Sequence, residues 1–180
     1  MLRLEENKRY LSLDAETDGL WGNPFAIGMI VYEVIGGKLV KLEETFWRLP
    51  DSVVKNEWVV SNVLPTLDFP VTHESYEEML KNFSEKYLSK KNATMLWHMG
   101  HIVESHLFRE LHKFGFIGDW DAPYVPVEVS ALLATAGEKA DSVDTYAEKY
   151  GIGKPTGSTH NPLYDCEVTA RVFEHLCLNN

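Results

Sequence analysis

Two carboxylates, Asp14 and Glu16, stand two positions apart in a segment of alternating apolar residues, 10–16. Residues two apart on a strand point to the same side of the sheet, so this spacing places both acids on one face. Neighbouring carboxylates repel each other, and a divalent cation with oxygen ligands relieves that repulsion. The pair is therefore either part of a metal site or two exposed acids at the end of a strand, before the turn at residues 17–19.

A second group, His160 and Asp165, surrounds the predicted start of the last helix. Asn161 is a favourable N-cap, and Pro162 suits the first helical position. One helical turn then brings His160 and Asp165 to the same end of the element. A histidine beside a metal-bound carboxylate can accept a proton from water near neutral pH. The alternatives are a loop imidazole and an acid stabilised by the helix N-terminus.

A third acid, Glu104, follows Gly100 near the start of another predicted helix, just after a strand predicted at residues 93–98. It lies beside the apolar stripe of that helix rather than opposite it. An acid in this place either faces solvent or points into a site at the carboxyl end of the strand. The sequence leaves both interpretations open.

Three histidines near Glu104 raise an alternative, a zinc site formed by His98, His101 and His106. Spacings of three and five residues do not place all three on one helical face, and no cysteine is near. We expect ordinary imidazoles here, with His98 or His101 contacting a phosphate. Cys166, on the last helix, is expected to be a small packing residue rather than a nucleophile.

The elements that position these residues follow a mixed order. Three strands are predicted at residues 10–16, 25–32 and 38–47, and Gly36-Gly37 is typical of a hairpin turn. Helical spacing predicts helices near residues 58–64, 76–87, 103–114, 142–150 and from 162 onward, and further strands are predicted at 93–98 and 124–129. This order predicts an α/β fold, a mixed five-stranded sheet with three antiparallel strands and then parallel strands, flanked by helices. Trp58 and Trp97 are expected in its core.

The composition limits the function classes. The chain has 180 residues, 44% of them hydrophobic, which predicts one domain over residues 1–180 with a substantial core. The 17 Lys and Arg against 27 Asp and Glu give a net charge of −10, which excludes a broad basic surface for duplex DNA. Two cysteines cannot form a disulfide framework, and the longest apolar run, residues 25–32, is too short to cross a bilayer. We expect a soluble cytoplasmic protein without a membrane partner.

Together these residues resemble the DEDDh branch of the DnaQ-like 3′→5′ exonucleases, which have the ribonuclease H-like fold. The family's first motif, Asp-x-Glu followed by Thr and a Gly turn, is matched at residues 14–19. Its last motif, His, four residues and then Asp, is matched at residues 160–165. The middle motif normally ends in Asp after an aromatic residue, and here Val103-Glu104 stands in its place. Residues 56–65 and 97–100 are similar to the RNase AS-like exoribonucleases within that branch.

The resemblance implies a two-metal-ion exonuclease that releases nucleoside 5′-monophosphates. It implies Asp14, Glu16, Glu104 and Asp165 as ligands of two Mg²⁺ or Mn²⁺ ions, with His160 as the proton acceptor, and Thr17, Leu20, Trp21 and His101 as substrate contacts. For Trp21, stacking on the terminal base and a partly buried loop anchor are both open. The implied partners are 3′ ends of single-stranded RNA or DNA, with RNA favoured, and a second copy in a homodimer.

Two other function classes remain from the sequence. One is a non-catalytic nucleic-acid-binding module with the same fold, although all five proposed catalytic residues are chemically competent. The other is a zinc-dependent hydrolase that uses His98, His101 and His106.

Overall fold

In the computed structural model, which describes residues 3–179, five strands form one mixed sheet. The strands are β1 (Arg9–Thr17), β2 (Pro24–Ile35), β3 (Lys38–Arg48), β4 (Thr94–Trp97) and β5 (Val127–Glu128), in the spatial order β3-β2-β1-β4-β5. The first three strands pair antiparallel, whereas β4 runs parallel to β1 and β5 runs parallel to β4. The predicted α/β class and mixed five-stranded sheet are confirmed.

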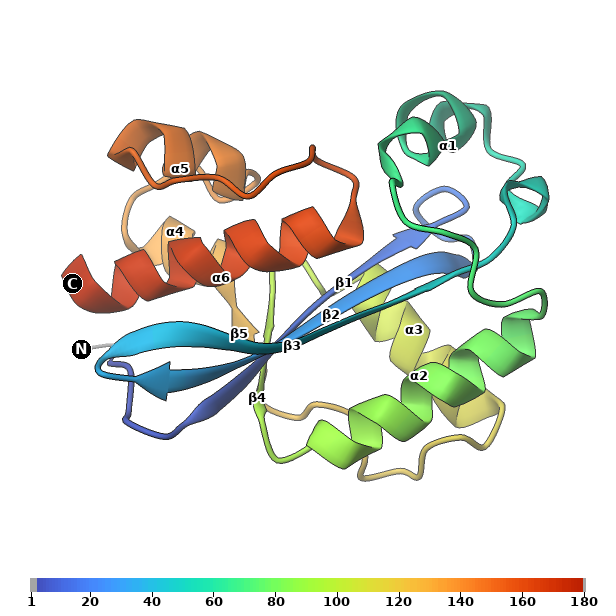
Figure 1. Cartoon of the computed structure of the whole chain (residues 1–180), viewed down its shortest axis with the longest axis horizontal. Coiled ribbons are helices and arrows are strands. Elements are labelled where there is room, and N and C mark those ends of the chain that lie inside the picture. Colours follow the sequence, from blue (N-terminus) through green and yellow to red (C-terminus); the bar gives the residue numbers. More distant parts are fainter. Residues whose placement is uncertain (1–2, 180) are drawn as a thin grey trace.

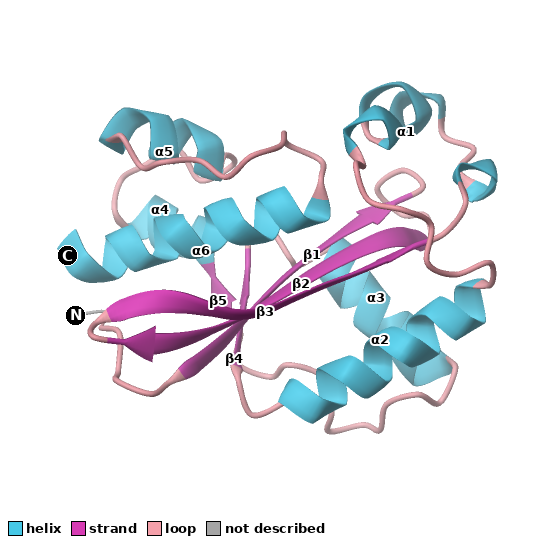
Figure 2. Cartoon of the chain, viewed as in Figure 1, coloured by secondary structure: helices cyan, strands magenta, loops and turns pink. Residues whose placement is uncertain are grey.

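Helices cover both faces of this sheet. They are α1 (Glu57–Asn62), α2 (Tyr76–Lys90), α3 (Val103–Lys113), α4 (Val129–Thr135), α5 (Val143–Tyr150) and α6 (Pro162–Asn179), with short 3₁₀ turns η1 (Asp51–Val53) and η2 (Leu64–Thr66). Helices α2 and α3 lie on one face, and α4, α5 and α6 lie on the other (Figures 1 and 2). β2 is buried along almost its whole length, as expected for a strand covered on both faces. No helix among residues 3–179 is long and apolar enough to span a membrane.

Local signals in the sequence explain several helix ends. The Ser142 side chain accepts a hydrogen bond from the Thr145 amide at the start of α5. Asn161 Oδ1 accepts from the amides of Leu163 and Tyr164 at the start of α6, at 3.1 and 3.4 Å. Gly151 ends α5 with a left-handed φ of 66°, a conformation that glycine adopts without strain.

The fifth strand is shorter than predicted. Only Val127 and Glu128 pair with β4, while Tyr124 and Val125 are 65% and 85% exposed. Pro126 has no amide hydrogen to donate to a ladder. The chain then turns directly into α4, an unpredicted helix whose N-cap is the Glu128 carboxylate, which accepts from the Ser130 amide.

Close packing of α6 on the sheet fixes the position of its first turns. A side chain at Gly28 on β2 would lie 2.6 Å from the carbonyl carbon of Pro162, so only glycine permits this approach. The Ser12 hydroxyl on β1 donates to the Cys166 carbonyl at 2.8 Å, and the Cys166 thiol donates to the Gly28 carbonyl at 3.3 Å. Cys166 is buried, in agreement with a packing role. These contacts place the residue before it, Asp165, beside β1.

Candidate active site

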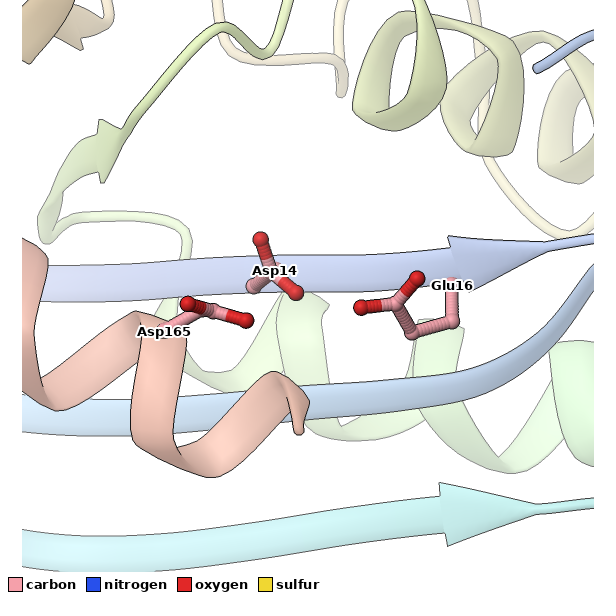
Figure 3. A group of neighbouring side chains, drawn as sticks. All are labelled: Asp14, Glu16 and Asp165. Carbon is pink, nitrogen blue, oxygen red and sulfur yellow. The ribbon is translucent and has the colours of Figure 1, made fainter. Parts of the chain in front are cut away.

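Three carboxylates from the two ends of the chain meet at the carboxyl end of β1. Asp14 and Glu16 extend from β1, and Asp165 extends toward them from the first turn of α6 (Figure 3). One oxygen from each of the three lies within 4.8 Å of the others. Among residues 3–179, no other group of three or more His, Cys, Asp or Glu side chains offers its ligand atoms so closely together. Carboxylate oxygens on these half-buried side chains suit a hard divalent cation.

Glu104 lies at the same cleft but takes a different position. Its side chain is 3% exposed, and its Oε1 accepts a hydrogen bond from the Ala15 amide at 3.1 Å. Of the two orientations that the sequence left open, the structure therefore has the buried one. Glu104 is attached to the strand between Asp14 and Glu16 but stands outside the close group of three.

The pKa values of these four acids show that burial and mutual repulsion destabilise their charged forms. Burial, and then the neighbouring carboxylates, raise the pKa of Asp14 and that of Glu16 well above their usual range. Burial raises the pKa of Glu104 and that of Asp165 to about 7, although amide donors oppose the shift. The charged groups that shift these values are themselves carboxylates, so bound cations would supply the missing positive charge.

His160 stands at the edge of the acidic group. Its Nδ1 lies 3.9 Å from Glu16 Oε1, and its amide donates to Asp165 Oδ2 at 2.8 Å. Its φ of 67° is unusual for a residue with a side chain, and the Thr66 hydroxyl donates to its carbonyl at 2.7 Å. Burial lowers the pKa of the His160 imidazole, which keeps the ring neutral and able to accept a proton near pH 7.

The carboxylates line a cleft of about 410 Å³ together with His160, His101 and Leu20. A second cleft of about 360 Å³ adjoins it and contains Thr17, Leu20 and Trp58. Glu16, Leu20 and His160 line both clefts. The predicted substrate contacts Thr17, Leu20 and His101 are therefore brought to the acidic group.

Two tryptophans near the site are exposed. Trp21 is 73% exposed and is not among the residues that line either cleft. Trp58, expected in the core, is 56% exposed and lines the second cleft, so that prediction is wrong. Val59 of the same short helix is the buried residue, which turns Trp58 outward. Trp97 is buried, as predicted.

The three histidines near Glu104 do not form a metal site. His98 Nε2 lies 2.9 Å from the Ala140 carbonyl, and His106 Nε2 is buried without a hydrogen-bond partner among the described residues. His101 is exposed and lines the first cleft. The zinc site considered from the sequence is therefore not present in residues 3–179.

The turn after β1 carries a structural residue that the sequence reasoning missed. Asp18 Oδ1 accepts hydrogen bonds from the amides of Lys55 and Asn56, at 2.9 and 2.7 Å. Asn56 in turn caps α1, accepting from the Trp58 amide at 3.1 Å. These bonds tie α1 to the strand that carries Asp14 and Glu16. The only signal in the sequence is an Asp-Gly turn, which does not reveal a partner 37 positions away.

Similarity to known proteins is found in the structure and not in the sequence. No protein-family model matches the sequence, and no curated protein matches it either. Solved structures do match. Cell-death related nuclease 4 superposes with a TM-score of 0.67 at 11% identity, over 94% of this chain and 63% of that chain. Exonuclease X in complex with 5′-overhanging duplex DNA gives 0.63 at 19% identity, over 95% of this chain and 92% of that chain.

A third structure, a full-length 3′-exonuclease, gives a TM-score of 0.68 at 9% identity, over 99% of this chain and 63% of that chain. This chain thus covers less than two thirds of the length of cell-death related nuclease 4 and of the full-length 3′-exonuclease. At such identities the similarity shows the fold alone, which this chain shares with these three nucleases.

Proposed function

We propose that the chain, as a single exonuclease domain over residues 1–180, hydrolyses single-stranded nucleic acid from the 3′ end with two divalent cations. The observation that carries this proposal is the meeting of Asp14, Glu16 and Asp165 within 4.8 Å of one another. Glu104 beside them and His160 near Glu16 complete the set of groups that the reaction needs. The shared fold with exonucleases supports the same function.

Asp14, Glu16, Glu104 and Asp165 would hold two Mg²⁺ or Mn²⁺ ions, which supply electrostatic stabilisation at the scissile phosphate and acidify a water. His160 accepts the proton of the attacking water at its imidazole, which its lowered pKa keeps neutral. The Ala15 amide holds the Glu104 carboxylate in place. The product is a nucleoside 5′-monophosphate.

The two adjoining clefts suit the end of a strand. Thr17 and Leu20 would contact the terminal nucleotide in the second cleft, and His101 would contact a phosphate in the first. Trp21, which is 73% exposed beside Leu20 in the chain, would offer a stacking surface to a base outside the two clefts. RNA is the favoured substrate because of the similarity to RNase AS-like exoribonucleases. The net charge of −10 disfavours long salt-dependent tracking along a duplex.

The experiment uses matched RNA and DNA single strands with a 5′ label, incubated with the protein and Mg²⁺, Mn²⁺ or Zn²⁺. We expect stepwise shortening with Mg²⁺ or Mn²⁺, faster on RNA, and its loss in Asp14→Asn. Asp119→Asn is the control, because the exposed side chain of this aspartate contacts only His112 of α3 among the described contacts, and its carbonyl, which accepts from Tyr124, is unchanged. Intact strands that still bind the protein would indicate a binding module, and shortening by Asp14→Asn would place the activity elsewhere.

A further inference from the structure

Trp58 contacts His160 through an edge-to-face arrangement. The two ring centroids lie 5.3 Å apart with an interplanar angle of 88°. Trp58 is more than half exposed, so its ring contributes little to the core. Aromatic rings that meet in this geometry attract each other beyond the area they bury. The contact therefore acts between a surface tryptophan and the proposed proton acceptor.

The backbone of His160 is held on both sides, whereas its ring is not. The His160 amide donates to Asp165 and its carbonyl accepts from Thr66, which stabilises the unusual positive φ. Within residues 3–179, neither ring nitrogen of His160 makes a hydrogen bond, and the 3.9 Å separation from Glu16 is too long for one. The χ angles of the imidazole are therefore restrained mainly by the Trp58 ring.

Trp58 is itself fixed relative to Glu16. Asn56 caps α1, and Asp18 accepts from the Asn56 amide in the turn that directly follows β1. The close approach of Gly19 to the Asn56 side chain, where a Cβ would lie 2.7 Å from Nδ2, keeps this junction compact. The indole and the Glu16 carboxylate thus belong to one connected unit, against which the His160 ring is positioned.

We infer that Trp58 is a positioning residue that holds the His160 imidazole toward Glu16. The inference rests on the proposed exonuclease function. Without the indole, the ring samples the other staggered χ1 wells, so the productive fraction and kcat fall roughly 3–10-fold. Since Trp58 acts through His160, its removal changes kcat rather than the KM for the strand.

A double-mutant cycle separates this role from stacking of Trp58 on a substrate base. In the wild-type background, Trp58→Ala lowers kcat roughly 3–10-fold with KM nearly unchanged, and Trp58→Phe, which keeps an aromatic edge, recovers most of the loss. In the His160→Ala background, Trp58→Ala has no further effect. A rise in KM of similar size in both backgrounds would overturn the inference and indicate base stacking.

A measurement without substrate tests the contact independently of activity. The proton NMR signals of the His160 ring are assigned by their loss in His160→Ala. Trp58→Ala should shift them, because the indole edge is removed, whereas Trp120→Ala, at an exposed ring stacked on Tyr124, should not. Unchanged signals in Trp58→Ala, in a variant whose melting temperature equals that of wild type, would contradict the contact. A contact seen in a protein that degrades no nucleic acid would overturn the exonuclease function and, with it, the positioning role.

Discussion

The Ala15 amide donates a hydrogen bond to Glu104 Oε1 across 3.1 Å, and so joins β1 to α3 at the residue between Asp14 and Glu16. In the exonuclease family that the sequence resembles, the shorter aspartate stands at the position of Glu104. The additional methylene of glutamate reaches the strand backbone here, and the Glu104 side chain is almost fully buried.

Two substitutions at Glu104 separate the hydrogen bond from the charge. Glu104→Asp should leave the buried Ala15 amide without its acceptor, which lowers the free energy of unfolding by about 1–3 kcal/mol. Glu104→Gln keeps a carbonyl acceptor, so its stability should remain near that of wild type while its Mn²⁺ affinity falls at least about tenfold. Urea unfolding and Mn²⁺ titration calorimetry measure the two effects. A stable Glu104→Asp protein would show that the Ala15 bond contributes little.

Stability without metal should decrease as the pH rises. Glu104 and Asp165 have a folded-state pKa of about 7, raised by burial above the values expected for the unfolded chain. The folded state therefore holds protons that the unfolded state releases, so stability is greatest below the unfolded-state pKa and is lost as the pH rises through about 7. In EDTA, the free energy of unfolding should fall between pH 5 and pH 8, by up to about 1.4 kcal/mol per pH unit for each group. A constant or rising value would contradict the crowding of these carboxylates.

Removal of one charge from the acidic group should stabilise the metal-free protein. Asp14→Asn preserves side-chain shape and relieves repulsion with Glu16 and Asp165, so the melting temperature in EDTA at pH 8 should rise by about 2–4 °C for each kcal/mol gained. The upward shift that Mn²⁺ gives the wild-type protein should be absent in this variant. Differential scanning calorimetry with EDTA and with Mn²⁺ tests both effects. A lower melting temperature in EDTA would mean that Asp14 has a stabilising partner.

Gly28→Ala should disturb the docking of α6. The added methyl group would lie 2.6 Å from the Pro162 carbonyl carbon and 2.8 Å from its oxygen, and backbone atoms cannot move aside as a side chain can. We expect a loss of about 1–3 kcal/mol in the free energy of unfolding, with weaker Mn²⁺ binding because Asp165 moves with the helix. Gly153→Ala is the matched control, since its methyl group would meet Arg171 at an ordinary 3.6 Å. Equal stabilities of the two variants would contradict this packing.

The fold was largely predictable because its decisive signals are local. The caps at Ser142 and Asn161 and the hairpin at Gly36 and Gly37 each determine a boundary from a few adjacent residues. Helix α4 was missed because its start depends on the Glu128 carboxylate, whose other contacts, the amides of Met99 and Gly100, come from a different part of the chain.

The site was predictable only in parts. Sequence spacing alone places Asp14 beside Glu16 and His160 near Asp165. It does not show that the two pairs lie together in the folded chain. The resemblance supplied that expectation. Trp58 was misplaced because an apolar side chain on a six-residue helix was expected to be buried, whereas Val59 takes the buried position. The orientation of Glu104 depended on the rotation of α3 against β1, which the sequence leaves open.

The hydrogen bond from Ser12 to the Cys166 carbonyl links residues that are 154 positions apart. A contact of such sequence separation closes a long loop, and its entropic cost is met late in folding. We therefore expect Asp14 and Glu16 to meet Asp165 only when α6 docks, so that the mutual repulsion of the carboxylates arises at that step. High metal affinity should appear only in that final step, so bound cations should slow unfolding more than they accelerate folding.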